Sequence, residues 1–551
     1  MRLKYIVLTI VLLVTGMQAI GGPKTPFQNY KIFPSPTVHQ IEPSIVRHPT
    51  NPLIMFASAY TISFSPFYRN EGLYITTNGG ANWFGANIIP DGLQGFHNGD
   101  PGPLITPGGK LVLTHIGGDL QIVRNYANYS TNNGTNWTSP YAIFSNTNNS
   151  QGKGSATIDD VTGSPYFGRM YYACNMITSN APIIFAYTTE NDNLWQQVIP
   201  VNSSVSGHQS VGSSISVGPN GQVYLAWAEL LTVAPQNENY IGFARSTNGG
   251  VNWNVSEQAY DCNGIFTGNL PPWGIRVNGY PSIDADVSGG PNNGWIYIAT
   301  GEKNLAPAGS DPDIIFHRST DDGQTWSQGI RVNQDAVNNG KIQYFPAMRV
   351  DEAGGINVIY YDTRNTPSND SVDVYLSRST DGGNTWRDIL ITNNKFYPEP
   401  VIGGGGGGNQ GDNIGITSGN GKLWPVWMGK YAGDNVYQTW TASIDISSIG
   451  VTKLSSEIPS SFELMQNYPN PFNPETKVQY KVSKSGNISL KLYDLLGREL
   501  TTLAAGFHTA GIYEVTLNTA SLKNVTMSSG YYFYRLTAEG VSLSKLMILA
   551  K

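Results

Sequence analysis

A polar motif of eight residues that recurs six times is the strongest constraint on how this 551-residue chain can fold. Aligned on their final tryptophan, the copies are TTNGGANW (76–83), STNNGTNW (130–137), TTENDNLW (188–195), STNGGVNW (246–253), STDDGQTW (319–326) and STDGGNTW (379–386). The tryptophans lie 54, 58, 58, 73 and 60 residues apart. This period suits a four-stranded β-propeller blade with its loops.

The residue types of the motif predict a stapled hairpin turn. The third residue always offers an acceptor oxygen for backbone N–H groups, and glycine, at the fifth position in five copies, permits positive φ. Because asparagine stands for aspartate in three copies, an acceptor is needed and a negative charge is not. A catalytic or metal-binding use is the alternative. The predicted structural residues are Asn78, Trp83, Asn132, Trp137, Asn248, Trp253, Asp321, Trp326, Asp381 and Trp386.

Two apolar strands precede each motif, as in "GSSISVGPNGQVYLAWAEL" (212–230), so the motif is expected between the third and fourth strands of a blade. Residues 412–446 supply three further strands without a motif, and 29–35 resembles a fourth strand. The N-terminal strand is therefore expected to close the ring. We predict an all-β chain: a seven-bladed (alternatively six-bladed) propeller followed by a small Ig-like β-sandwich.

The N-terminus has the features of a secretory signal peptide. Arg2 and Lys4 precede an apolar run that is too short to span a bilayer, and cleavage is expected after Ala19. Losing these two cations moves the formal charge from −6 to −8, and no basic run remains that could bind nucleic acid. We expect export, no transmembrane span after signal removal and no nucleic-acid partner. The predicted domains are 1–19 (signal peptide), 28–447 (propeller), 448–460 (linker) and 461–551 (sandwich).

The repeated motif resembles the Asp-box of the sialidase superfamily, over Asn29 to about Ile446. The resemblance implies a propeller that binds or hydrolyses extracellular glycans or glycoproteins. Sialidases of this family are six-bladed and use three arginines, a tyrosine nucleophile paired with a glutamate, and an aspartic acid/base. Where they carry an Arg-Ile-Pro motif, this chain has Ile32-Phe33-Pro34 with no arginine before it. A non-catalytic adhesion or glycan-binding propeller is therefore the alternative.

If the motifs lie on one face of the ring, a ligand would bind at the other face, around the mouth of the central channel. The candidates come from the starts of the first strands and from the loops after the second strands. Alternatively, the carboxylates cap strand N–H groups, the arginines are solvated and the tyrosines pack in the core. The candidate catalytic residues are Asp100, Tyr280 and Glu302, and the candidate ligand-binding residues are Glu42, Arg69, His208, Arg276, Tyr361, Asp362, Arg364 and Asp412.

The tail is similar to the type A C-terminal sorting domain of the type IX secretion system. The matching residues are NYPNPFNP (467–474), YDLLGRE (493–499), GYYFYRL (530–536) and the final 545–551. The resemblance implies recognition by that secretion machinery and a secreted or outer-membrane cell-surface location.

Other sequence features predict less. Cys174 and Cys262 are either buried thiols or a disulfide, since sequence cannot supply their separation. The six glycines at 403–408 are expected to be a flexible connector. No cofactor is expected, and the sequence does not settle whether a metal such as calcium binds.

Overall fold

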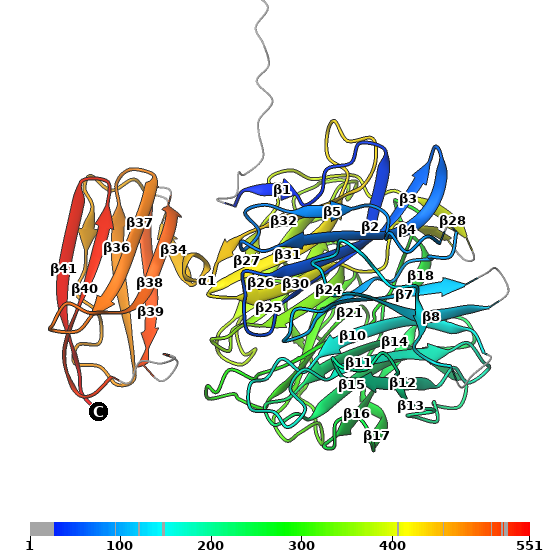
Figure 1. The fold of residues 1–551 in the computed structure, drawn as a ribbon. Coiled ribbons are helices and arrows are strands. Elements are labelled where there is room, and N and C mark those ends of the chain that lie inside the picture. The colour runs from blue at the N-terminus through cyan, green and yellow to red at the C-terminus, as the bar shows by residue number, and fades with distance from the viewer. Residues whose placement is uncertain are drawn as a thin grey trace, which may run out of the picture.

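The protein is described here from a computed structural model that covers residues 27–551 except 94, 119–121, 146–148, 405–406, 456, 509, 520–521 and 523–526. The proposed signal peptide lies outside the described residues. Those residues form an all-β structure in which four-stranded sheets predominate, with one short helix, α1 (Ile446–Ile449). Figure 1 shows the larger, N-terminal group of sheets joined through α1 to a smaller group at the C-terminus.

Six consecutive antiparallel sheets of the larger group share one topology, in which each strand pairs with the next along the chain. Their strands are β2 (Val38–Arg47), β3 (Met55–Phe64), β4 (Phe67–Thr76), β5 (Phe84–Ala86); β6 (Gly102–Ile105), β7 (Leu111–Gly118), β8 (Val123–Ser130), β9 (Tyr141–Ala142); β10 (Gln151–Ile158), β11 (Met170–Met176), β12 (Ile183–Thr188), β13 (Gln196–Val198); β14 (His208–Val217), β15 (Val223–Leu231), β16 (Glu238–Ser246), β17 (Asn254–Asp261); β20 (Ser282–Ala285), β21 (Ile296–Glu302), β22 (Asp313–Ser319), β23 (Ile330–Arg331); and β24 (Gln343–Val350), β25 (Ile356–Asp362), β26 (Asp373–Ser379), β27 (Arg387–Leu390).

A further sheet joins the two ends of this region. It contains β30 (Gly415–Gly419), β31 (Lys422–Gly429), β32 (Gln438–Ala442) and the N-terminal strand β1 (Asn29–Lys31), while β33 (Ile444–Asp445) pairs with β31. Asn29, Tyr30 and Lys31 pair with Ala442, Thr441 and Trp440. The first strands of neighbouring sheets contact one another in the order β2, β6, β10, β14, β20, β24, β30 and back to β2. The expected closure by the N-terminal strand is therefore present.

The polar motif lies on the turn between the third and fourth strands, as predicted, and its hydrogen bonds repeat from sheet to sheet. In the fourth copy, Ser246 Oγ and the backbone N–H of Asn252 both donate to Asn248 Oδ1, each at 2.9 Å, and Gly250 N donates to Ser246 Oγ at 2.9 Å. Asp381 accepts the equivalent bonds at 2.8 and 2.9 Å. Asparagine and aspartate thus accept the same two hydrogen bonds through Oδ1.

The motif also packs against the preceding sheet. The indole rings of Trp253, Trp326 and Trp386 lie edge-on to Phe185, Phe243 and Phe316, with ring centroids 4.7, 5.2 and 5.1 Å apart. The motif glycines 250, 323 and 383 have φ of 85–90°, and an added Cβ would overlap the same phenylalanine rings. Glycine is needed for its conformation and for this close approach.

The third copy is the exception. Glu190 turns to the neighbouring sheet, where Thr106 Oγ1 donates to it at 2.5 Å, and Thr188 Oγ1 donates to the carbonyl of Leu194 instead. Trp195 is buried and its indole N–H donates to Tyr129 Oη at 2.9 Å.

A small additional sheet lies outside this pattern. It contains β18 (Thr267–Leu270), β19 (Ile275–Val277), β28 (Ile402–Gly404) and β29 (Gly407–Asn409). The hexaglycine segment was expected to be a flexible connector, but its two ends pair as a hairpin, and Gly408 pairs with Ile275. Residues 405 and 406 lie outside the described residues. Cys174 and Cys262 are buried free thiols.

The C-terminal region consists of two four-stranded antiparallel sheets around one apolar core. Its strands are β34 (Val451–Ser455), β35 (Glu463–Leu464), β36 (Glu475–Val482), β37 (Gly486–Tyr493), β38 (Glu499–His508), β39 (Gly511–Asn518), β40 (Gly530–Ala538) and β41 (Val541–Leu549). β34 lies inside the segment predicted as a linker, yet it pairs with β39.

The hydrogen-bond pattern predicts that the Asn248→Asp protein keeps its stability, whereas Asn248→Ala loses about 1 kcal/mol. The aspartate retains Oδ1 as acceptor for Ser246 and Asn252, and alanine leaves both donors without it. Urea unfolding followed by tryptophan fluorescence measures the difference. Equal losses in the two variants would show that the acceptor oxygen does not stabilise the turn.

Candidate functional site

A cavity of about 240 Å³ lies where the first strands of seven sheets, and the segments that lead into them, come together. It is lined by residues 44 and 46, 100–103, 153–156, 212–214, 278 and 280–282, 345–347 and 412–414. These segments belong to, or directly precede, β2, β6, β10, β14, β20, β24 and β30. Most of the lining lies toward the ends of the strands opposite the tryptophan motifs, the side on which the sequence analysis expected a ligand. We call this region the channel mouth.

The backbone at the channel mouth is irregular in a repeated way. Glu42, Asp100 and Phe345 have φ of 53–55°, in the left-handed region, and Gly212 has φ 64° in the equivalent place. The pairing register of β2, β14 and β24 shifts at the same points. Such conformations cost roughly 1–3 kcal/mol each for a residue other than glycine, and they concentrate at functional sites.

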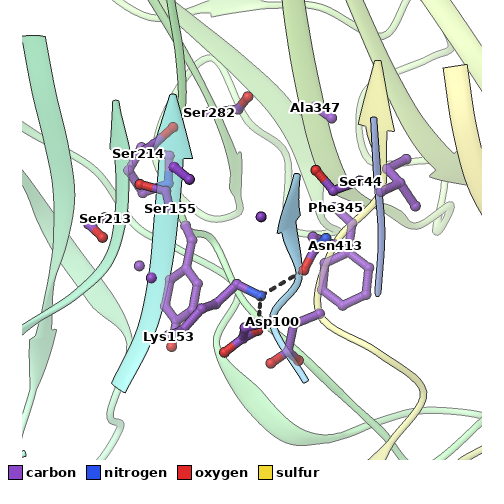
Figure 2. Close-up of a pocket in the computed structure, with 18 of the residues that line it drawn as sticks. Ser44, Asp100, Lys153, Ser155, Ser213, Ser214, Ser282, Phe345, Ala347 and Asn413 are labelled. Atoms are coloured by element: carbon purple, nitrogen blue, oxygen red, sulfur yellow. Dashed lines mark hydrogen bonds and ion pairs between the residues drawn. The ribbon is translucent and has the colours of Figure 1, made fainter. Parts of the chain in front are cut away.

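Lys153 is the central cation of the mouth. Its Nζ donates to Asp100 Oδ1 at 2.8 Å and to Asn413 Oδ1 at 2.7 Å, as the dashed lines of Figure 2 show. Burial acts to lower the pKa of Lys153, but the carboxylates of Asp100, Asp412 and Glu42 outweigh it, so that the pKa lies above its usual range. Lys153 is therefore charged.

Glu42 lies behind Asp100. Its Oε2 accepts the backbone N–H of Asp100 at 3.1 Å, and its side chain is buried. Burial and then the charge of Asp100 raise the pKa of Glu42 well above the usual range, although Lys153 opposes the shift. At the mouth, Glu42, whose carboxyl group resists ionisation, therefore lies next to Asp100, which is paired with Lys153.

Arg276 and Asp412 form the second ion pair of the mouth. The guanidinium donates from Nε at 3.2 Å and from Nη2 at 2.5 Å to the two carboxylate oxygens. Tyr280 and Phe345 contribute aromatic rings to the cavity wall, and Ser44, Ser155, Ser214 and Ser282 contribute small polar side chains (Figure 2). Charged, amide, hydroxyl and aromatic groups thus face one small space.

The other end of the channel is crossed by ion pairs of the protein itself. Asp160 accepts from Arg47 at 3.3 Å and from Arg349 at 3.4 Å, and Arg349 also lies 3.7 Å from Asp284. These residues stand at the ends of first strands from four different sheets, counting Asp160 just beyond β10. The charges at that end are compensated by one another.

Of the predicted residues, Asp100, Tyr280 and Asp412 line the cavity, and Glu42 and Arg276 contact two of them. Three others lie elsewhere. Glu302 is buried and accepts from Thr300 Oγ1 at 2.5 Å. His208 lies 2.8 Å from Asn239 Oδ1. Tyr361 is buried in the core and donates to the carbonyl of Met428 at 2.7 Å, so it packs rather than faces the mouth.

The three predicted arginines are not all free to bind the carboxylate group of one ligand. Arg364 donates from Nε to Asp362 at 2.8 Å, pairs with Asp388 and lies 4.2 Å from the ring centre of Tyr375. Arg276 is held by Asp412, and Arg69 lies 5.7 Å from the ring centre of Phe67. Two of the guanidinium groups are therefore occupied by carboxylates of the protein.

Sequence reasoning missed Lys153, Asn278, Phe345 and Asn413. Lys153 occupies the irregular point of its strand, where β2 and β24 have Pro43 and Pro346. A charged residue in place of that proline was the available signal.

Residues 466–550 match the family described as the secretion system C-terminal sorting domain. This domain marks proteins that the type IX secretion system exports to the cell surface or extracellular space, and it defines the location of this chain. Within the described residues, no helix has the length and apolarity needed to cross a membrane. No curated protein matches the chain in sequence.

Several solved structures are similar in fold at low identity. An ulvan lyase is 11% identical with a TM-score of 0.46, covering 76% of this chain and 96% of its own. An intramolecular trans-sialidase from Ruminococcus gnavus is 11% identical with a TM-score of 0.37, covering 58% and 90%. An alpha-L-arabinofuranosidase from Fusarium graminearum is 13% identical with a TM-score of 0.39, covering 64% and 98%. None of these similarities assigns an activity to the chain.

Glu302 generates a prediction about pH. Burial raises its pKa from 4.5 to about 7, so between these values the folded protein keeps a proton that the unfolded chain releases. The stability contributed by protonated Glu302 is present below pH 4.5 and is lost as pH rises through 7. In the Glu302→Gln protein, the fall in unfolding free energy over this window should be smaller by up to about 3 kcal/mol.

Urea unfolding at a series of pH values measures this effect. The matched control is Glu539→Gln, whose side chain is exposed in the C-terminal region. Parallel pH profiles for wild type and Glu302→Gln would refute the assignment.

Proposed function

We propose that this exported protein is a sialidase-like β-propeller that binds sugar residues of extracellular glycans or glycoproteins at the channel mouth. The observation that carries the proposal is the cavity itself, which brings two ion pairs, an asparagine amide and two aromatic rings together from different sheets. Carboxylates accept hydrogen bonds from sugar hydroxyls, Lys and Asn donate to them, and aromatic rings pack on the apolar faces of sugars.

The seven-bladed form of the propeller belongs to this proposal. Its support is the closed order of contacts among the first strands, together with the pairing of β1 with β32. In this arrangement the hairpin motifs lie on the rim of one face, and the mouth opens on the other. The C-terminal region, as an Ig-like sandwich, would then present the sorting signal to the type IX secretion machinery.

The ion pairs favour hydroxyl-rich sugars over sialic acid. A carboxylate ligand would need a free cation, but Arg276 is held by Asp412 and Lys153 by Asp100. Breaking either pair would leave a partly buried carboxylate without its partner, which is costly. A sugar whose hydroxyls bridge the existing charges needs no such exchange.

Hydrolysis is the second candidate, favoured by Glu42 and Asp100. Glu42 and Asp100 are neighbours, since the backbone N–H of Asp100 donates to Glu42; Glu42 is buried and holds its proton more tightly than usual, and the Asp100 carboxylate forms an ion pair with Lys153. Glycosidases combine a protonated acid with an ionised carboxylate in this way. On this reading Asp100 is the group that faces the ligand, since it lines the cavity.

Lys153 provides the test of ligand binding. The Lys153→Met protein should lose about 1.5–3 kcal/mol of affinity, roughly ten- to hundredfold, for any glycan that a glycan array shows the wild type to retain. The matched control is Lys395→Met, since Lys395 is exposed, donates to the carbonyl of Asn365 and does not belong to the cavity lining. Tyr280→Phe tests the cavity wall with less risk to folding.

The same proteins should be assayed with a panel of fluorogenic glycosides. Turnover that disappears in Asp100→Asn supports hydrolysis, and retention without turnover supports a binding protein. Absence of both retention and turnover for the folded wild type would overturn the proposed function.

A further inference from the structure

A second polar cluster lies behind the channel mouth, between the first two sheets. Glu71 on β4, His97 in the segment before β6, and His115 on β7 place one potential ligand atom each within 4.8 Å of one another. All three side chains are fully buried. The cluster is separate from the cavity, whose lining contains none of these residues.

Two atoms of the cluster are buried without a hydrogen-bond partner: Glu71 Oε2 and His97 Nδ1. An unpaired buried acceptor costs about 1–3 kcal/mol, so such atoms are rare in folded proteins. Here two of them occur in the same group of side chains. A buried carboxylate oxygen and a buried imidazole lone pair that lack donors are what a cation site offers before the ion is added.

The surrounding contacts orient the imidazole of His97 for this role. Its Nε2 lies 3.2 Å from Asp91 Oδ2, whose side chain is also fully buried. The carboxylate makes Nε2 the protonated nitrogen and leaves the lone pair on Nδ1. This carboxylate–histidine arrangement is typical of metal-ligating histidines.

His115 has to turn one ring nitrogen away from an acceptor oxygen before that nitrogen can bind an ion. Its Nδ1 lies 2.9 Å from the carbonyl oxygen of Ile116, and its Nε2 lies 2.8 Å from Asn128 Oδ1. The amide of Asn128 is oriented by donating to Thr138 O and Asp91 Oδ2. Both ring nitrogens therefore face acceptors, but a neutral imidazole has only one N–H.

We propose that Glu71, His97 and His115 bind a divalent transition metal ion, with Zn²⁺ as the best fit. Glu71 would bind through Oε2, His97 through Nδ1 and His115 through the ring nitrogen that is not protonated. Imidazole nitrogen with one carboxylate suits zinc and disfavours calcium or magnesium. Tetrahedral zinc needs ligand atoms roughly 3.3 Å apart, so the side chains close around the ion by small rotations.

The ion would fix the segment that carries Asp100. Glu71 Oε1 accepts the backbone N–H of Gly99 at 3.0 Å, and Gly99 O accepts from Ile116 N at 2.9 Å. The metal thus joins the strands on which Glu71 and His115 lie to the residue next to the mouth. Its role is structural, because all three side chains are fully buried and none of them lines the mouth cavity.

The test measures metal in the full-length protein, purified without chelators or a polyhistidine tag after growth in zinc-supplemented medium. About one zinc per chain is expected by plasma mass spectrometry. Glu71→Gln and His97→Gln should each reduce bound zinc about tenfold or more. His317→Gln is the matched control, because His317 is also buried but belongs to a different sheet, and it should retain the metal.

A second measurement does not depend on the variants folding. Wild-type protein stripped with chelator should regain several degrees of Tm when ZnCl₂ is added, and cobalt in place of zinc should give the visible absorption of a tetrahedral site. No stoichiometric metal in the purified protein, together with an unchanged Tm on adding ZnCl₂, would overturn the proposal.

Discussion

The contact between the motif glycine and a side chain of the preceding sheet, which is a phenylalanine ring in the last three copies, is the interaction on which the ring depends. Each sheet has an apolar face that must be covered by its neighbour. Phe185, Phe243 and Phe316 lie on third strands and receive the tryptophan edge and the bare glycine backbone of the next motif. The hydrogen bonds around Asn248 or Asp381 make the turn rigid enough for this docking. The motif is therefore an inter-sheet staple as well as a hairpin turn.

The repeat allowed much of the fold to be predicted, because each motif marks the same turn and its period sets the size of a sheet. The inter-sheet partners were not predicted, although Phe185, Phe243 and Phe316 each precede the first residue of a motif by three positions. The glycine-rich hairpin at 402–409 was not readable, since its pairing with Ile275 joins segments more than a hundred residues apart. The segment was expected to be flexible because glycine has no side chain. The same property allows Gly408 to approach the neighbouring backbone.

Three of the predicted site residues line the cavity, whereas the orientation of others was not predicted. Asp100, Tyr280 and Asp412 follow from topology, because the starts of first strands converge in any such ring. Tyr361 and Asp362 followed from the same logic, yet they are buried. The position of a loop determines the path of its backbone. The direction of a side chain depends on its partners, which here are the Met428 carbonyl for Tyr361 and Arg364 for Asp362, and the sequence does not reveal these partners. Lys153 is the opposite case. It lies within a strand and was not predicted, but a local shift in pairing register directs its side chain into the channel.

Buried carboxylates that accept backbone N–H groups explain how the strained mouth persists. Asp100 and Glu42 have left-handed backbone conformations, which are unfavourable for both residues. Glu42 accepts from Asp100 N, and Glu71 accepts from Gly99 N, so two adjacent peptide groups are held by carboxyl groups from the first sheet. Each such bond contributes about 0.5–1.5 kcal/mol, so the two together are comparable to the cost of strain at one residue. The position of Asp100 is thus determined by its neighbours, and a change at Glu71 is transmitted to the mouth through one glycine.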